Sequence, residues 1–140
     1  MYGDKIGEMA WMDLSVPNAE LVKGFYQQVL GWQSEAVNMS CDGESYVDFS
    51  MSVKQSDTTA EQNENNGFAT GICHAKGANA DMPAVWLPYF LVSDIDVAVG
   101  KVQMLKGRLV TNIKNMGDDR YVVIEDPAGA KCALYQKDAK

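Results

Sequence analysis

The feature of this sequence that most constrains its fold is a segment that occurs twice. The first copy runs from Trp11 to Trp32 (WMDLSVPNAELVKGFYQQVLGW), and the second runs from Leu87 to Arg108 (LPYFLVSDIDVAVGKVQMLKGR). Four residues of the first copy recur 76 positions later: Val16, Gly24, Gln27 and Gly31. Each copy has the pattern of a short strand, a polar turn, about three helical turns and a closing glycine. A repeat within 140 residues predicts two half-domains that share one core.

Each copy also carries an apolar stripe at helical spacing, which we expect to pack against neighbouring strands. In the first copy the stripe consists of Leu21, Val22, Phe25, Val29 and Leu30. In the second copy it consists of Ile95, Ala98, Val99, Val102 and Leu105. Asn18 is the predicted N-cap of the first helix, and Ser93 with Asp96 resembles a capping box for the second. Gly31 and Gly107 are predicted to end the helices in the left-handed conformation.

The rest of the chain completes two β-α-β-β-β halves within a single domain, residues 1–140. Strands are predicted at 7–16, 33–39, 45–53 and 68–74, and at 86–92, 108–113, 120–125 and 130–136. The first half covers about 7–74, the linker about 75–84 and the second half about 85–137, and the polar segment 54–66 is a predicted surface loop. Halves of this kind usually form an α+β fold, an open, trough-like mixed sheet with helices outside and a cavity between the halves.

Composition excludes some classes of partner. Nineteen acidic and 12 basic residues give a net charge of −7, which repels nucleic acid and favours a neutral or cationic partner. No apolar run is long enough to cross a membrane, and the start of the chain lacks a signal-peptide pattern, so we expect a cytoplasmic protein. Cys41, Cys73 and Cys132 are odd in number and lack CxxC spacing. They are predicted to be reduced, with Cys41 the most exposed.

Three segments carry a resemblance to a known family: Leu14 to Trp32, Trp86 to Val99 and Asp126 to Gln136. Their F-Y-x-x-V-L-G-W stretch and D-P-x-G turn, in this order, resemble the vicinal oxygen chelate (VOC) superfamily. This superfamily includes glyoxalase I, bleomycin-resistance proteins and extradiol dioxygenases. The resemblance spans Gly7 to Gln136 and implies the fold of that family.

The resemblance also implies where a metal would bind. Metal-dependent members take a His or Glu from the first and last strand of each half, and here these positions hold Trp11, Gly71, Leu87 and Ala133. None of these side chains binds a divalent metal, so we expect no metal site of the usual kind and no cofactor. An alternative is a rearranged site built from Asp13, Cys73 and His74, to which the second half contributes no ligand.

The same strands predict the lining of the trough. Its predicted ligand-binding residues are Trp11, Asp13, Gly71, Cys73, Leu87, Tyr89, Ala133 and Tyr135. Aromatic walls suit a planar or cationic organic molecule. The alternative is that these side chains fill the trough as ordinary core. His74, the single histidine, is predicted to be structural or to face solvent, and no catalytic residue is assigned.

Our leading functional hypothesis is a bleomycin-resistance-like protein that binds a small, partly apolar organic molecule without a metal. A second hypothesis is an enzyme, a lyase, isomerase or dioxygenase, that uses a rearranged metal site or acid-base chemistry by Asp13 or a tyrosine. A third is a dimerisation or regulatory module with no ligand. The resemblance further implies a homodimer.

Overall fold

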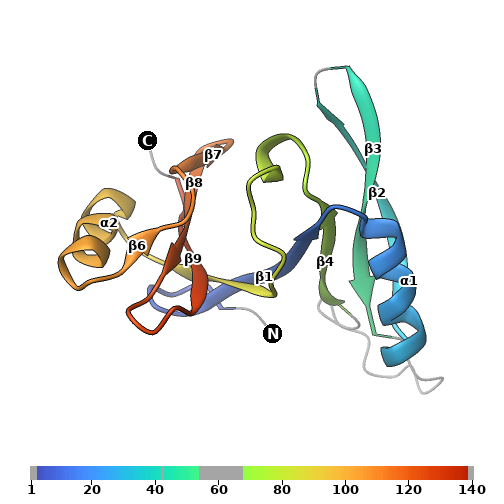
Figure 1. Cartoon of the computed structure of the whole chain (residues 1–140), viewed down its shortest axis with the longest axis horizontal. Coiled ribbons are helices and arrows are strands. Elements are labelled where there is room, and N and C mark those ends of the chain that lie inside the picture. Colours follow the sequence, from blue (N-terminus) through green and yellow to red (C-terminus); the bar gives the residue numbers. More distant parts are fainter. Residues whose placement is uncertain (1–2, 42, 54–67, 139–140) are drawn as a thin grey trace. The chain divides into compact units, whose positions relative to one another are not determined.

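The computed structural model describes residues 3–41, 43–53 and 68–138, and Figure 1 shows the whole chain. The described elements, in chain order, are β1 (Met9–Val16), α1 (Ala19–Leu30), β2 (Gln33–Cys41), β3 (Glu44–Ser52), β4 (Phe68–His74), the 3-10 helix η1 (Gly77–Asn79), β5 (Leu87–Leu91), α2 (Ile95–Met104), β6 (Arg108–Leu109), β7 (Lys114–Met116), β8 (Asp119–Glu125) and β9 (Lys131–Gln136). Neither α1 nor α2 is long and apolar enough to span a bilayer.

Contacts divide the chain into two compact units. Unit 1 contains residues 13–84, and unit 2 contains residues 3–12 together with 85–138. Strand β1 contributes to both, because the division falls between Met12 and Asp13. The boundary after Ala84 coincides with the end of the predicted linker. That the two halves make up one domain stays a prediction.

Unit 1 is a sheet with one helix against it. Its strand order is β2-β3-β4-β1, in which β4 pairs with β1 in parallel and the other pairs are antiparallel. Leu14, Phe49 and Ile72 lie in register across three strands and form a buried apolar face. Helix α1 covers this face, because the Lys23 Nζ atom lies 4.6 Å from the centroid of the Phe49 ring (Figure 1).

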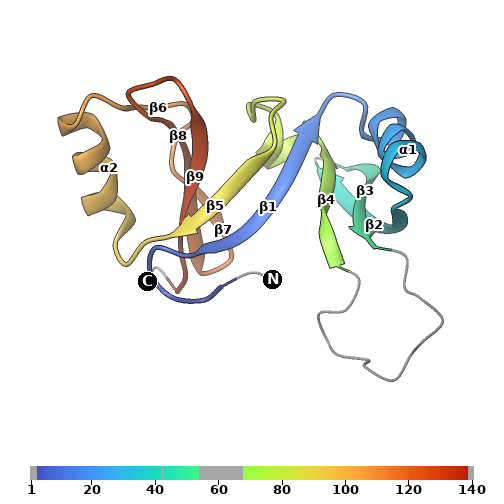
Figure 2. The ribbon, with the colours of Figure 1, turned by 90° about the horizontal axis from the view of Figure 1, so that it is seen from below.

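Unit 2 repeats this arrangement with a shorter edge. Its strand order is β1-β5-β9-β8-β6, with β7 pairing with β8, and β5 runs parallel to β9. Helix α2 contacts β6, β8 and β9 (Figure 2). Ile95 of α2 packs with Val122 and Ile124 of β8 as the centre of an apolar core. The face of the sheet that carries Val122 and Ile124 is therefore the side that α2 covers.

The strand register confirms the internal repeat. In unit 1 the first and last strands pair Asp13 with Gly71, and in unit 2 they pair Tyr89 with Ala133. Asp13 and Tyr89 are 76 positions apart, the offset of the sequence repeat, and Gly71 and Ala133 are the residues predicted to hold equivalent positions in the two last strands. The predicted α+β class with two β-α-β-β-β halves is confirmed.

The helix caps agree with the sequence at α1 and differ at α2. The Oδ1 atom of Asn18 accepts a hydrogen bond from the amide of Leu21 at 3.1 Å, as predicted. At α2 the predicted Ser93 cap is wrong, since the N-cap is Asp94. Its Oδ1 atom accepts hydrogen bonds from the amides of Asp96 and Val97 at 3.0 and 3.1 Å. Both serine and aspartate make good N-caps, so neighbouring candidates compete on geometry alone.

The two helix ends also differ. Gly31 has a φ of 73°, the predicted left-handed conformation. After α2 the left-handed residue is Lys106, with a φ of 75°, and the prediction for Gly107 is wrong. Position 107 requires glycine because a larger residue would clash with its neighbours. A Cβ atom there would lie 2.8 Å from the carbonyl oxygen of Glu125 and 2.9 Å from Cγ1 of Val102.

The predicted burial of the apolar side chains Leu21, Val22, Phe25, Val29 and Leu30 of α1 is wrong at four of these five residues. The side chains that remain largely exposed are Leu21 at 70%, Phe25 at 57%, Val29 at 59% and Leu30 at 52%. The helix instead turns toward the sheet with fully buried Ala19 and with half-buried residues such as Val22 and Tyr26. The stem of Lys23 completes this contact, since a long charged side chain can cover apolar surface while its ammonium group stays accessible. Leu105 of α2, 66% exposed, departs from its prediction in the same way.

Among the strands, the predicted strand 108–113 is divided. The amides of Val110 and Thr111 both donate to the carbonyl oxygen of Val123, and the amide of Val123 donates to the Thr111 hydroxyl oxygen at 3.1 Å. This irregular pairing ends β6 after two residues, and pairing resumes in β7. Strand β2 extends to Cys41, two residues beyond its predicted end. The predicted loop 54–66 lies outside the described residues.

Candidate functional site

In unit 1, three of the predicted site residues lie together on the side of the sheet opposite α1. Asp13 and Gly71 are direct neighbours on adjacent parallel strands. A Cβ atom on Gly71 would lie 3.5 Å from Cβ of Asp13 and 3.9 Å from Sγ of Cys73. The glycine therefore leaves a space that a carboxylate and a thiol border.

Sequence reasoning missed Asp48, a buried carboxylate beside this space. Asp48 is 5% exposed, and its Oδ1 atom accepts a hydrogen bond from the backbone amide of His74 at 2.8 Å. It also accepts a hydrogen bond from the Cys73 thiol. Burial, and then the negative charges of Asp13 and Asp48, raise the pKa of Cys73 far above that of a free thiol. The thiol therefore stays protonated and is a poor nucleophile. The sequence signal that could have revealed Asp48 is its spacing of two from Tyr46 along β3, which puts both side chains on the same face of the strand.

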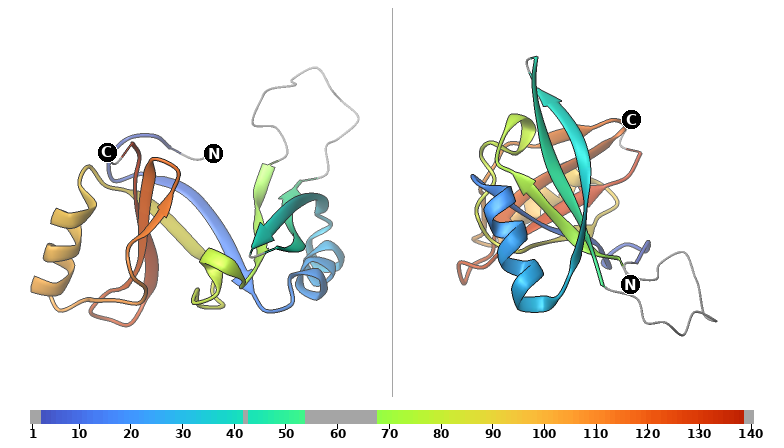
Figure 3. Two further views of the ribbon diagram at one scale, coloured as in Figure 1. Left: turned by 90° about the horizontal axis from the view of Figure 1, so that it is seen from above. Right: turned by 90° about the vertical axis from the view of Figure 1, so that its right-hand side faces the viewer.

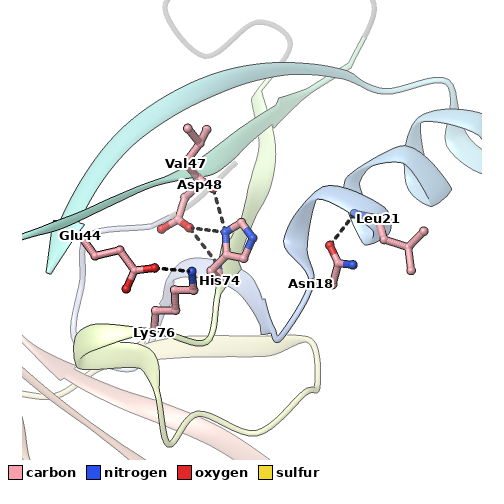
Figure 4. A network of polar contacts seen from close by, with 7 residues as sticks. All are labelled: Asn18, Leu21, Glu44, Val47, Asp48, His74 and Lys76. Carbon is pink, nitrogen blue, oxygen red and sulfur yellow. Dashed lines mark hydrogen bonds and ion pairs between the residues drawn. The ribbon is translucent and has the colours of Figure 1, made fainter.

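His74 joins two strands. Its Nδ1 atom lies 2.8 Å from the carbonyl oxygen of Val47 and 3.5 Å from Oδ1 of Asp48 (Figure 4). The Tyr46 ring meets the imidazole edge to face, at 5.9 Å between centroids. These contacts agree with the predicted structural role, because they bind the end of β4 to β3.

In unit 2, four predicted site residues share the face of the sheet opposite α2. Val122, Ile124, Cys132 and Leu134 belong to the helix-side core, so the alternating residues of β8 and β9 face the other way. That other face carries Leu87, Tyr89, Ala133 and Tyr135. The first three are buried, at 2%, 6% and 0% exposure, while Tyr135 is half-buried.

Two further residues, Tyr121 and Asp119, complete this face and were missed in the sequence. The rings of Tyr89, Tyr121 and Tyr135 lie 6.0 to 6.3 Å apart between centroids. The hydroxyl of Tyr135 donates a hydrogen bond to Oδ2 of Asp119 at 2.5 Å. The alternation of side chains along β8 could have assigned Tyr121 to this face. Only the observed register of β8 and β9 shows that it lies opposite Tyr135.

Electrostatics in this group follow from the Tyr135 hydrogen bond. Burial, and then the bond to Asp119, raise the pKa of Tyr135 above its ordinary value. The same hydrogen bond is the main reason why the pKa of Asp119 is lowered. The pair is therefore a neutral phenol bound to a carboxylate. We call Tyr89, Tyr121, Tyr135 and Asp119 the tyrosine cluster.

The last predicted site residue, Trp11, lies on β1 two positions before Asp13 and is 40% exposed. Together with Gly71, Leu87 and Ala133 it occupies the positions at which metal-dependent relatives are expected to hold their ligands. An indole, a hydrogen, an isobutyl group and a methyl group supply no donor to a divalent cation. Within the described ranges, no three His, Cys, Asp or Glu side chains come together in a way that could hold a metal ion. The residues present do not fit the family's metal.

Unit 2 also contains an apolar groove on its helix side. It has a volume of about 310 Å³. Its lining comes from α2, from the segment after α2 and from the β8–β9 turn, and includes Val92, Ala98, Val102, Leu105, Ile124, Pro127 and Leu134. None of the predicted site residues contributes to it. The groove is therefore distinct from the tyrosine cluster, which lies on the opposite side of the same sheet.

Comparison with known proteins gives a family and a fold. Residues 8–134 match the family model described as Glyoxalase/Bleomycin resistance protein/Dioxygenase superfamily. The anthracycline biosynthesis protein DnrV of Streptomyces peucetius is 29% identical over 132 residues, which are 94% of this chain and 47% of the relative. The putative glyoxylase CFP32 of Mycobacterium tuberculosis is 29% identical over 133 residues, 93% of this chain and 46% of the relative. The chain thus spans about half the length of the curated relatives it matches.

Solved structures share the fold at low sequence identity. A methylmalonyl-CoA epimerase in complex with methylmalonyl-CoA and NH4+ superposes with a TM-score of 0.52 at 10% identity, covering 96% of this chain and 97% of the epimerase. A hypothetical protein of Bacillus halodurans C-125 gives a TM-score of 0.52 at 9% identity, covering 97% and 98% of the two chains. The match of the family model over almost the whole chain settles the family. The chain belongs to the Glyoxalase/Bleomycin resistance protein/Dioxygenase superfamily.

Proposed function

We propose that this chain binds a small, partly apolar organic molecule without the metal used by many members of its family. The observation that carries the proposal is the pair of positions at which the first and last strands of each unit meet. Gly71 lies beside Asp13, and Ala133 lies beside Tyr89, so small side chains stand where a metal ligand would be expected. Loss of the donor and gain of space at the same two positions favour binding over metal chemistry.

The tyrosine cluster indicates the chemical character of the ligand. Faces of aromatic rings attract cations, and a nearby carboxylate adds to that attraction. Tyr135 is half-buried, so it is the ring of the cluster that an incoming molecule reaches first. The net charge of −7 also attracts cations at long range. A planar aromatic ligand with a positive charge fits these features best.

The curated relatives support the same class. The Streptomyces peucetius relative is named for anthracycline biosynthesis, and anthracyclines are planar polycyclic aromatic compounds. By resemblance to bleomycin-resistance proteins, the role proposed for this chain is sequestration of such a molecule.

Fluorescence titration with a panel of planar aromatic dyes tests the proposal. We expect cationic dyes to bind with one dye per chain, and anionic dyes of the same size to bind at least about 10-fold more weakly. Tyr135→Leu should weaken binding of the cationic dyes. Tyr26→Leu, which alters a half-buried tyrosine of α1, should leave it unchanged. No binding by any dye would instead favour a tyrosine cluster that serves only as core.

A second candidate function is catalysis of the glyoxalase type. One observation favours it, namely that the Mycobacterium tuberculosis relative is named a putative glyoxylase. Such an enzyme would turn over the hemithioacetal formed by a thiol and a 2-oxoaldehyde, and a dioxygenase would consume a catechol. Assays with both substrates and added divalent metals distinguish this candidate, and turnover that depends on the metal would support it.

We also propose that the chain forms a homodimer, as members of this family often do.

A further inference from the structure

The outward side of α1 carries a continuous apolar surface. We call Leu21, Gly24, Phe25, Gln28 and Val29 the α1 stripe, since their spacings of three and four place them along one side of the helix. Leu21, Phe25 and Val29 are 70%, 57% and 59% exposed. Single exposed apolar residues are normal, but three in a row on one helix face are typical of an interaction surface. Figure 3 shows α1 lying against the strands of unit 1, with its other side directed away from them.

The internal repeat supplies a comparison surface within the same chain. Shifted by 76 positions, the α1 stripe becomes Val97, Gly100, Lys101, Met104 and Leu105 of α2. Lys101 thus takes the place of Phe25, and Lys106 takes the place of Leu30 one residue beyond the stripe. The equivalent side of α2 also exposes apolar side chains, Val97 at 53%, Met104 at 77% and Leu105 at 66%, but it has the charged Lys101 at its centre. The α1 stripe contains no charged residue. The two helices therefore differ in what their outward sides can contact.

The α1 stripe is complementary to itself. No heavy atom outside the helix backbone and its chain neighbours lies within 4 Å of a Cβ atom built on Gly24, so a second helix can approach closely there. When two such helices cross antiparallel at this point, Leu21 of one lies near Val29 of the other, and each Phe25 ring lies over the partner's glycine. This is the isologous arrangement that a twofold axis requires.

We propose that the α1 stripe is the surface through which two copies of this chain associate, with the two α1 helices antiparallel. This inference rests on the homodimer proposed above. Two copies with a net charge of −7 each repel one another, and an uncharged surface is where this repulsion is least costly.

Lysine substitutions test the interface, because α2 shows that lysine is compatible with these helix positions. Phe25→Lys gives α1 the residue that the repeat has at position 101. Val97→Lys is the matched control, since Val97 is 53% exposed and is the repeat equivalent of Leu21. Light scattering coupled to gel filtration should give twice 15.4 kDa for the wild type and for the control. Phe25→Lys should give one chain's mass, with a dimer dissociation constant raised by about 100-fold or more, because each dimer loses two apolar contacts.

Each other outcome has a definite meaning. A wild-type mass of 15.4 kDa contradicts both the homodimer and its surface. If Phe25→Lys remains a dimer while circular dichroism shows native structure, the surface is wrong and the homodimer stands. If Phe25→Lys does not fold, Leu21→Lys, at the position matched by the control, takes its place with the same expected result. Loss of the dimer in the Val97→Lys control would also contradict the assignment to α1. None of these measurements involves a ligand, so the proposed binding function is tested separately.

Discussion

At the scale of single residues, Asp48 determines the chemistry of its neighbours. It is buried, it accepts a hydrogen bond from the backbone amide of His74, and its charge contributes to the raised pKa of Cys73. A buried carboxylate is retained where it is hydrogen-bonded, and here the partners come from the adjacent strand β4. The thiol is the most sensitive probe of this arrangement.

Replacing Asp48 with Asn should make Cys73 more reactive. Asparagine keeps the acceptor oxygen but removes a negative charge, so the pKa of Cys73 should fall. Because burial is the largest cause of the shift and remains in place, we expect only a roughly 3- to 10-fold faster alkylation by iodoacetamide at pH 8. Mass spectrometry of the alkylated peptides measures the rate, with Cys132 as the internal control. An unchanged rate at Cys73 would show that the Asp48 charge does not act on the thiol.

The hydrogen bond from Tyr135 to Asp119 should contribute a stability that depends on pH in two directions. The lowered pKa of Asp119 means that its contribution is present above the ordinary carboxyl pKa of about 4 and is lost as the pH falls below it. The raised pKa of Tyr135 means that its contribution is present below the ordinary phenol pKa of about 10 and is lost as the pH rises above it.

Urea unfolding of the wild type and Tyr135→Phe measures this difference. We expect the variant to be less stable by about 1 kcal/mol between pH 5 and pH 9, a modest value because the hydrogen bond from Tyr135 to Asp119 is only partly buried. The difference should shrink below about pH 4 and above about pH 10. A difference that stays constant across this range would contradict the assigned hydrogen bond.

At the scale of elements, two glycines of unit 2 should respond oppositely to alanine. A methyl group on Gly107 would meet the Glu125 carbonyl oxygen at 2.8 Å, and backbone cannot move as a flexible side chain can. Gly100 lies within α2, with open space around its Cβ position. Gly107→Ala should therefore lower the free energy of unfolding by about 2 kcal/mol, whereas Gly100→Ala should raise it by about 0.5 to 1 kcal/mol. Urea unfolding measures both, and equal effects would show that the segment after α2 packs differently.

The elements themselves were largely predictable because hydrophobic spacing and turn residues identify them locally. Helix α1 and strand β4 have the expected bounds, and Asn18 caps α1 as its position before the apolar stripe indicates. What the sequence did not fix was the face that α1 buries. Its stripe could pack or remain exposed, and the outcome depends on how Ala19 and the Lys23 stem fit the Phe49 side of the sheet. The early end of β6 likewise depends on a single hydroxyl, that of Thr111.

The residues of the candidate site were predictable only where the pattern within a single strand, or the internal repeat, identifies them. The repeat related Gly71 to Ala133 in the two last strands, and the structure pairs them with Asp13 and Tyr89. Tyr121 did not, because no local pattern reveals which residue of β8 lies opposite Tyr135. Asp48 was missed for the same reason. The register between paired strands depends on turn geometry and on which face the whole sheet buries.

At the scale of the whole molecule, the proposed function combines a family fold with loss of the family's metal site. The repeated pairing of first and last strand is preserved in both units, and Gly71 and Ala133, which lie in those pairs, carry no side-chain donor atom for a metal. Catalysis by the usual metal of the family would require those donors, whereas binding of an organic cation requires only shape, aromatic rings and negative charge. Whether ligand binding depends on a metal therefore distinguishes the two proposed functions.

Titration calorimetry of the purified chain with a cationic planar aromatic dye, in buffer with and without EDTA and then with added divalent metal, tests this claim most directly. The account predicts one binding event per chain with the same dissociation constant in all three conditions. Binding that disappears in EDTA and returns with the metal would contradict it.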